Sequence, residues 1–177
     1  MGDALIRTVR ADDAAAIADI YAHFVRETAI TFEIESPDAD AMRARIATIS
    51  ARYPYLVVED DGAVIGYAYA NELYARAAYR WVVESTIYLT PNQHRRGSGR
   101  RLYQALLDAL RARGFQAAVG KITLPNGASV GLHEALGFAE IGRFHRVGYK
   151  QGAWHDVALY QIELADRPSR PAEPRQE

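Results

Sequence analysis

Residues 92–101, NQHRRGSGRR, place five basic side chains around two glycines in a chain whose formal net charge is -1. Gly97 and Gly99 allow consecutive backbone N–H groups to turn toward one point. The run that follows, RRLYQALLDALRARG, has helical spacing, so the positive end of a helix dipole would face the same point. The segment therefore predicts a loop that binds a phosphate-bearing ligand, and a solvated basic turn that caps the helix is the competing interpretation.

The spacing of this loop separates it from two familiar phosphate-binding loops. A nucleoside-triphosphate loop ends in Gly-Lys-Ser/Thr, whereas Arg100 and Arg101 follow Gly99 here. A dinucleotide loop has a third glycine three positions after the second, where this chain has Leu102. We therefore expect a phosphate-bearing ligand of another class.

Glu84 is the only acidic residue in the β-rich run YRWVVESTIYLT. An unpaired carboxylate is costly in such a run, so the residue is either functional or paired. In an ideal strand it shares a face with Thr86 and Tyr88 and can look into a pocket beside the sheet. The sequence leaves two interpretations open: a general base, or a salt bridge to Arg76 or Arg80.

Composition limits the function further. The chain has 177 residues, 49% hydrophobic and 24% charged, which predicts one soluble globular domain. Cysteine is absent, which excludes disulfides and thiolate chemistry on the protein. Near-neutral charge argues against general nucleic-acid binding. No secretory signal or membrane-length apolar run is visible, so we expect no membrane association and a cytoplasmic location.

The elements that would position these residues alternate between strands and helices, which predicts an α/β domain with a mixed sheet flanked by helices. Asp12 or Asp13 is expected to cap the first helix and Ser36 the second. We expect the domain to cover 1–164 and the proline-rich segment 165–177 to be a disordered tail. In order, the elements are a strand in 4–10, helices in 11–29 and 36–53, a hairpin in 55–73 around Asp61-Gly62, a strand in 79–90, a helix in 100–114, a strand in 116–124, a short helix in 125–137 and two final strands.

Several stretches together resemble the GCN5-related N-acetyltransferases (GNAT). HRRGSG is similar to the family's pyrophosphate loop, with His94 where Gln or Arg is usual. YRWVVESTIYL, LPNGASVGLHEALGF and GYKQGAWHDVALYQ resemble the phosphinothricin and methionine sulfoximine acetyltransferase branch, and the resemblance covers nearly the whole chain before the tail. It implies the GNAT fold, a splayed sheet with acetyl-CoA between its two central strands, and a homodimer.

The resemblance also assigns the cofactor contacts. Backbone groups of the central strand would bind the thioester and the pantetheine arm, the basic loop would bind the pyrophosphate, and Asn126 with its neighbour Ser129 would contact the pantetheine. Helix capping by Asn126 and Ser129 fits the sequence equally well. The implied acetyl-CoA contacts are Ile87, Tyr88, Leu89, Arg95, Arg96, Gly97, Ser98, Gly99, Arg100, Asn126 and Ser129.

The same resemblance supports the functional interpretation of Glu84 as general base, acting directly or through water. It implies that His133, in LHEALGF, is the general acid that protonates the departing CoA thiolate. A lone helical histidine is otherwise more often structural. His23, His145 and His155 show no metal-ligand spacing, so we expect no metal site.

For the acceptor, Arg76 and Tyr79 match positions that grip the acidic head and the carboxylate in herbicide-acetylating relatives, and Phe32 matches a pocket wall or is plain core. Tyr74 occupies a position where phosphinothricin-specialised members carry Lys. The lost charge favours methionine sulfoximine, methionine sulfone or another amino acid over phosphinothricin. Another amine as acceptor, or an acyl-CoA-binding module without turnover, are the alternatives.

Overall fold

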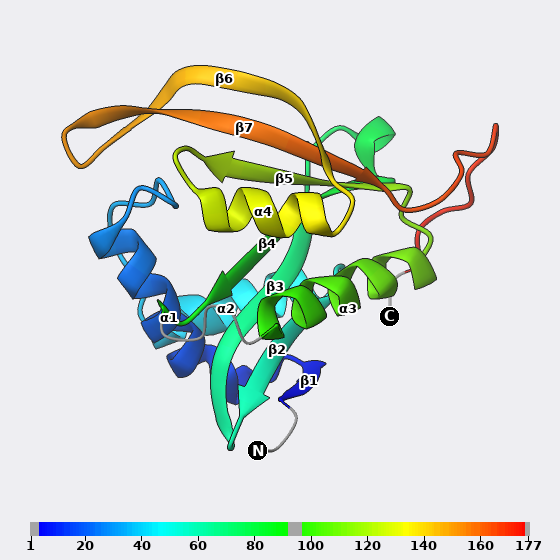
Figure 1. The fold of residues 1–177 in the computed structure, drawn as a ribbon. Helices are drawn as coiled ribbons and strands as arrows, with labels where there is room; N and C mark the ends of the chain where they lie inside the picture. Colours follow the sequence, from blue (N-terminus) through cyan, green and yellow to red (C-terminus); the bar gives the residue numbers. More distant parts are fainter. Residues whose placement is uncertain (1–3, 92–96, 176–177) are drawn as a thin grey trace.

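The computed structural model describes residues 4–91 and 97–175. These residues form a seven-stranded mixed sheet with four α-helices and two short 3-10 helices (Figure 1). The elements are β1 (Leu5–Thr8), η1 (Ala11–Asp13), α1 (Ala14–Glu27), α2 (Ala39–Ser50), β2 (Tyr55–Asp60), β3 (Ala63–Glu72), η2 (Ala77–Tyr79), β4 (Val82–Leu89), α3 (Ser98–Ala112), β5 (Ala117–Thr123), α4 (Gly127–Ala135), β6 (Ala139–Lys150) and β7 (Ala153–Glu163).

The sheet has the order β1-β2-β3-β4-β5-β7-β6. Only β4 and β5 are parallel, and they pair only from Val82 with Ala117 to Glu84 with Val119. Beyond Glu84 the two strands diverge, and Figure 1 shows their arrows leaving the shared end in different directions with α4 beside the opening. The sheet is therefore continuous at one end of its centre and open at the other.

Helices cover both faces of the sheet because neighbouring strand residues point in opposite directions. Val58 and Ala68 lie in the core cluster that contains Leu102, Leu106 and the rest of the buried face of α3. Val57 and Tyr67, one position away, lie in the second cluster with the buried faces of α1 and α2. The strict alternation thus builds two cores on one sheet.

The structure confirms most of the expected elements. Asp61 and Gly62 have φ values of 48° and 79° at the β2–β3 turn, which fits the Asp-Gly hairpin signal. The prediction for the second helix was wrong at its start: Asp38, not Ser36, is the N-cap, and its carboxylate accepts a hydrogen bond from the Ala41 N–H. Pro37 precedes the cap instead of opening the helix, which moves the first turn two residues along the chain.

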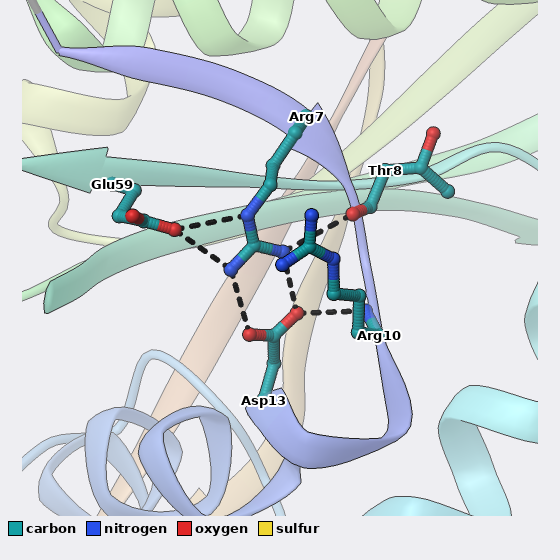
Figure 2. A network of polar contacts seen from close by, with 5 residues as sticks. All are labelled: Arg7, Thr8, Arg10, Asp13 and Glu59. Carbon is teal, nitrogen blue, oxygen red and sulfur yellow. Dashed lines mark hydrogen bonds and ion pairs between the residues drawn. The ribbon is translucent and has the colours of Figure 1, made fainter. Parts of the chain in front are cut away.

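Asp13 also differs from its expected role as a cap. It makes no side-chain cap bond to α1, and instead accepts hydrogen bonds from the Arg10 N–H at 2.7 Å and from the guanidinium of Arg7. Figure 2 shows Arg7 between Asp13 and Glu59, with Nε of Arg7 donating to Glu59 at 2.9 Å. The Arg7 hydrogen bond lowers the pKa of Asp13, and this network ties β1 to β2 and to the start of α1.

The segment after β7 returns to the body of the protein. Residues 165–175 contain neither helix nor strand, yet the Trp81 indole N–H donates to the Ala172 carbonyl at 2.8 Å and Arg80 pairs with Glu173 at 2.6 Å. The Arg175 N–H donates to the Arg113 carbonyl at 2.8 Å. These contacts join the segment to the loop that precedes β4, while the expected boundary at 164 and the disorder of the tail stay predictions.

We predict that Asp13→Ala lowers the free energy of unfolding by about 3 kcal/mol, because it leaves a mostly buried guanidinium without its main partner. Asp40→Ala removes an exposed partner of Arg43, with 89% of the Asp40 side chain exposed, and is expected to cost less than about 1 kcal/mol. Urea unfolding at neutral pH measures both variants.

The lowered pKa gives this prediction a pH dependence. The stability that ionised Asp13 contributes is present above its ordinary pKa of 3.8 and is lost as the pH falls below that value. The difference between wild type and Asp13→Ala should therefore shrink at acidic pH. If Asp13→Ala and Asp40→Ala lower the free energy of unfolding equally at neutral pH, the contacts among Arg7, Asp13 and Glu59 do not stabilise the fold as expected.

Candidate active site

A cavity of about 530 Å³ occupies the opening between β4 and β5. Its floor is the run of β4 from Glu84 to Tyr88, and its opposite wall is β5 from Lys121 to Thr123. The loop at 30–32 after α1, the start of α4 and the β6–β7 hairpin close the remaining sides. The divergence of the two central strands therefore creates a concave site lined by both polar and apolar groups.

A second hollow of about 110 Å³ continues this space along β4. The two share Ile87, Tyr88, Asn126 and Ser129, and the second extends to Leu89 and Leu132. The β4–β5 ladder stops at Glu84, so the peptide groups of Ile87 to Leu89 lie outside it. The structure thus brings together five of the residues expected to bind acetyl-CoA: Ile87, Tyr88, Leu89, Asn126 and Ser129.

The start of α3 lies at the end of this hollow. A Cβ atom at Gly99 would lie 2.7 Å from Cδ1 of Leu89, so the helix start lies directly against the Leu89 side chain of β4. Gly97 has φ 76° at the N-cap, and the first intrahelical bond runs from Arg101 N–H to Gly97 O. The N–H groups of Ser98, Gly99 and Arg100 thus have no acceptor within the helix and suit an anion.

Three residues of the expected phosphate loop lie outside the described residues: His94, Arg95 and Arg96. Their role stays a prediction.

Glu84 stands at the last paired position of β4, where the cavity begins. Its Oε2 lies 2.6 Å from Nζ of Lys121 on β5. The expected alternative of a salt bridge to Arg76 or Arg80 was wrong in its partner, because the carboxylate reaches across the fork to β5 rather than along the chain. Some 30% of the Glu84 side chain remains exposed, so an acceptor can reach it.

His133 is buried, with 3% of the residue exposed, on α4 at the cavity wall. Its Nδ1 donates to the Ser129 carbonyl at 2.8 Å, which leaves Nε2 to accept from the Tyr103 hydroxyl at 3.0 Å. Burial lowers the pKa of His133, so the ring is neutral near pH 7. The Ser85 hydroxyl lies 2.8 Å from the Tyr103 hydroxyl, which extends the chain of polar groups to the residue beside Glu84.

Of the residues expected to bind the acceptor, Phe32 and Tyr74 line the cavity. The ring of Phe32 lies against Gly148 of β6, where a Cβ would come within 2.1 Å of it. Tyr79 contacts Tyr74 edge-to-face at 4.9 Å and does not itself line the cavity. Arg76 is exposed at the start of η2 and does not line the cavity either.

Comparison with known proteins decides the family. The family model for the acetyltransferase (GNAT) domain matches residues 6–159. The chain belongs to the GNAT family. It is 41% identical to the phosphinothricin N-acetyltransferase of Streptomyces viridochromogenes over 96% of this chain and 93% of that protein. It is 36% identical to the L-methionine sulfoximine/L-methionine sulfone acetyltransferase of Salmonella typhimurium, over 90% of this chain and 94% of the relative.

A solved structure gives the same result for the fold. The GNAT superfamily phosphinothricin acetyltransferase of Sinorhizobium meliloti, in complex with acetyl-CoA, superposes with a TM-score of 0.92. The two proteins are 38% identical, and the match covers 96% of this chain and 94% of the other. The expected GNAT fold, with its mixed sheet flanked by helices, is therefore confirmed.

Sequence reasoning missed one charged residue of this GNAT site. Lys121 is the only charged residue in the strand run QAAVGKITL, which is the same signal that singled out Glu84. Its Nζ lies 2.6 Å from Glu84 and 5.9 Å from the ring centroid of Tyr74. The link from Ser85 through Tyr103 to His133 was also missed, because it joins three elements that are far apart in the chain.

Two further searches cover the described part of the chain. Within residues 4–91 and 97–175, no group of three or more His, Asp or Glu residues is arranged to hold a metal ion. In the same ranges, no helix is long and apolar enough to cross a membrane.

We predict that Gly120→Ala destabilises the fold by about 2 kcal/mol, because the new Cβ would lie 2.4 Å from Nε2 of His133. Gly131→Ala is the matched control: it lies on α4, its Cβ meets nothing within 4 Å, and helix propensity favours alanine by up to about 1 kcal/mol. Guanidinium unfolding compares the two variants. If Gly120→Ala unfolds at the same guanidinium concentration as wild type, the position of the His133 ring does not require a glycine at residue 120 of β5.

Proposed function

We propose that this protein transfers the acetyl group of acetyl-CoA to the α-amino group of a small amino acid, directly, in a ternary complex. The observation that carries the proposal is the position of Glu84. It lies at the fork of β4 and β5, in a cavity that continues along β4 to Leu89, which lies against Gly99 at the start of α3. A carboxylate thus lies at one end of this space, and the start of a helix whose N–H groups suit an anion lies next to the other end.

The residues present fit acetyl-CoA at one end of this space. The close approach of Gly99 to Leu89 leaves the N–H groups at the start of α3 next to the end of β4, where a pyrophosphate would bind. The peptide groups of Ile87 to Leu89 outside the β4–β5 ladder would hold the pantetheine arm and polarise the thioester carbonyl. Asn126 both caps α4 and lines the cavity, so its two interpretations are compatible.

Acetyl-CoA supplies an acetyl group activated as a thioester. The α-ammonium group of an amino acid, with a pKa of roughly 9 to 10, must lose a proton before it can attack. Glu84 accepts that proton, directly or through water. The amine nitrogen then forms the new C–N bond and loses its second proton while the C–S bond breaks, and the sulfur leaves as a thiolate that needs one proton.

His133 supplies that proton in the proposed mechanism. Because burial lowers its pKa, the ring is neutral at rest and must gain a proton before it can act as an acid. The Tyr103 hydroxyl lies 3.0 Å from Nε2 of His133 and 2.8 Å from the Ser85 hydroxyl, so it holds the ring at the cavity wall. The nitrogen loses two protons in all: Glu84 passes one to solvent, and the other balances the proton that His133 gives to the thiolate, so each turnover releases one proton. An unchanged kcat in His133→Asn would exclude this role.

The acceptor class rests on the relatives, which are named for phosphinothricin and for methionine sulfoximine and sulfone. Phe32 and Tyr74 form part of the cavity wall in this chain and are proposed to contact the acceptor side chain. Tyr79 supports Tyr74 from behind through its edge-to-face contact. Arg76 is proposed to bind, from the rim, the acidic head of an acceptor side chain such as that of phosphinothricin.

A homodimer is also part of the proposal. The β6–β7 hairpin carries five large apolar residues that are each between 46% and 59% exposed: Ile141, Phe144, Val147, Tyr149 and Trp154. Such a patch on one hairpin is typical of a subunit interface. Light scattering should give twice the 19.7 kDa mass of one chain, and a monomer at micromolar concentration would contradict the dimer.

The test of the function is acetyl-CoA-dependent thiol release with a panel of acceptors: phosphinothricin, methionine sulfoximine, methionine sulfone, spermidine, an aminoglycoside and a short peptide. We expect the highest kcat/KM on one of the three amino acids. Turnover confined to one of the other amines would transfer the proposal to that class. Acetyl-CoA binding without release on any acceptor would favour a binding module.

We predict that Glu84→Gln lowers kcat on the best acceptor by about 100-fold or more with little change in KM, because the amide keeps the shape but accepts no proton. Glu72→Gln, on the exposed end of β3, removes the same charge outside the cavity and should behave like wild type. Steady-state kinetics from pH 6 to 9, roughly the range around the acceptor's titration, measure both. A pH–rate profile for Glu84→Gln that matches wild type would remove Glu84 from the mechanism.

A further inference from the structure

The cavity wall carries an unusual pair of charges. Among its lining residues in the described part of the chain, Glu84 is the one carboxylate and Lys121 is the one ammonium or guanidinium. These two side chains face each other from β4 and β5 at 2.6 Å. About a third of each side chain is exposed, 30% and 34%, so both can exchange partners with a ligand in the cavity.

Lys121 is held to this position by its strand. It lies two residues beyond Val119, the last residue of β5 that pairs with β4, and its backbone register with Leu159 of β7 is regular. The strand therefore directs the side chain into the fork, while its four-carbon stem leaves the ammonium free to turn. The Tyr74 ring lies over the same ammonium, with its centroid 5.9 Å from Nζ.

Three other basic side chains that could be expected to serve the cavity do not line it. Lys150 donates to the Thr31 carbonyl at 2.7 Å in a buried position. Arg80 stacks on Trp81 and pairs with Glu173 outside the cavity. Arg76 is exposed beyond the wall. Within the described residues, Lys121 is thus the cation that an anionic group inside the cavity would meet first.

We propose that Lys121 binds the α-carboxylate of the acceptor and makes the site selective for free amino acids. This inference rests on the proposed function. An amino acid carries its ammonium and its carboxylate on the same carbon, and the cavity presents a carboxylate and an ammonium side by side. When the acceptor ammonium replaces Lys121 on Glu84, the released Lys121 ammonium pairs with the acceptor carboxylate beside it.

This exchange leaves every charge in the cavity with a partner. An amine without a carboxylate would take Glu84 and leave the Lys121 ammonium unpaired in a partly desolvated site, which is unfavourable. A polyamine or an aminoglycoside would add further positive charge next to Lys121. Discrimination against these amines therefore follows from a repulsive element in the cavity as well as from an attractive one.

The experiment compares methionine sulfone with its α-carboxamide, which keeps the amine and the side chain but has no carboxylate. We expect the wild-type protein to prefer the acid by about 100-fold in kcat/KM, and Lys121→Met to reduce that preference to about threefold or less, mainly through a higher KM for the acid. Lys121→Arg keeps the charge and should retain most of the preference. Arg111→Met removes an exposed cation that pairs with Asp108 on α3, and should match wild type.

Three kinetic results would overturn the inference. An unchanged acid-to-amide ratio in Lys121→Met would show that Lys121 does not bind the carboxylate. Equal losses on acid and amide, seen mainly in kcat, would mean that Lys121 only positions Glu84. A loss on phosphinothricin with methionine sulfone unaffected would assign Lys121 to an anionic side chain instead.

Two controls keep these results separate from other failures. If wild type acetylates no amino acid at all, the proposed function fails before the question of Lys121 arises. Thermal unfolding of Lys121→Met with and without CoA, together with titration of methionine sulfone into the CoA complex, distinguishes a lost acceptor contact from a misfolded variant. A folded variant that binds CoA and methionine sulfone like wild type would overturn the inference.

Discussion

The parallel pairing of β4 with β5 ends at Glu84 and Val119, and the remaining architecture of the site depends on that early end. A fully paired sheet would have closed the space that both hollows occupy, and it would have used the β4 peptide groups that face it. Because the strands diverge instead, α4 can place His133 at the wall, and α3 can bring Gly99 against Leu89. The fork thus converts a sheet, which normally uses its backbone groups internally, into a binding surface.

Glycines at three positions let the surrounding elements close on this fork. Gly99 lies against the Leu89 side chain, Gly120 against the His133 ring and Gly148 against the Phe32 ring. A Cβ atom at these positions would lie 2.7, 2.4 and 2.1 Å from those side chains, respectively. The Thr31 carbonyl beside Phe32 also accepts from buried Lys150, so the loop after α1 is fixed to the β6–β7 hairpin by a polar contact as well as by packing. The cavity walls therefore come from close approaches between distant elements rather than from any single one.

These close approaches explain what the sequence could and could not predict. Elements were predictable because periodicity and turn chemistry are local: the leucines of α3 and the Asp61-Gly62 turn followed from the residues alone. The isolation of Glu84 in an apolar strand indicated either a pocket residue or a paired carboxylate, and the structure shows both features. Its partner was not predictable, because Lys121 lies on another strand and only the register of the fork brings them together. Asp13 was misassigned because its carboxylate binds the guanidinium of Arg7, which also pairs with Glu59 of β2, instead of the N–H groups of α1.

Two ion-pair systems in this molecule show how burial separates structural from exchangeable charge. Arg7 is held by both Asp13 and Glu59, and only 15% of the Arg7 side chain and 8% of the Asp13 side chain are exposed. Separating Arg7 from Asp13 would therefore leave two mostly buried charges without the pairing that offsets their loss of hydration. Glu84 and Lys121 share one contact and are each about one-third exposed, so water and a ligand compete for both. A charge pair of the first kind fixes the junction of β1, β2 and α1. A pair of the second kind can be opened by a molecule that supplies the opposite charges in the same arrangement, and a free amino acid has that arrangement.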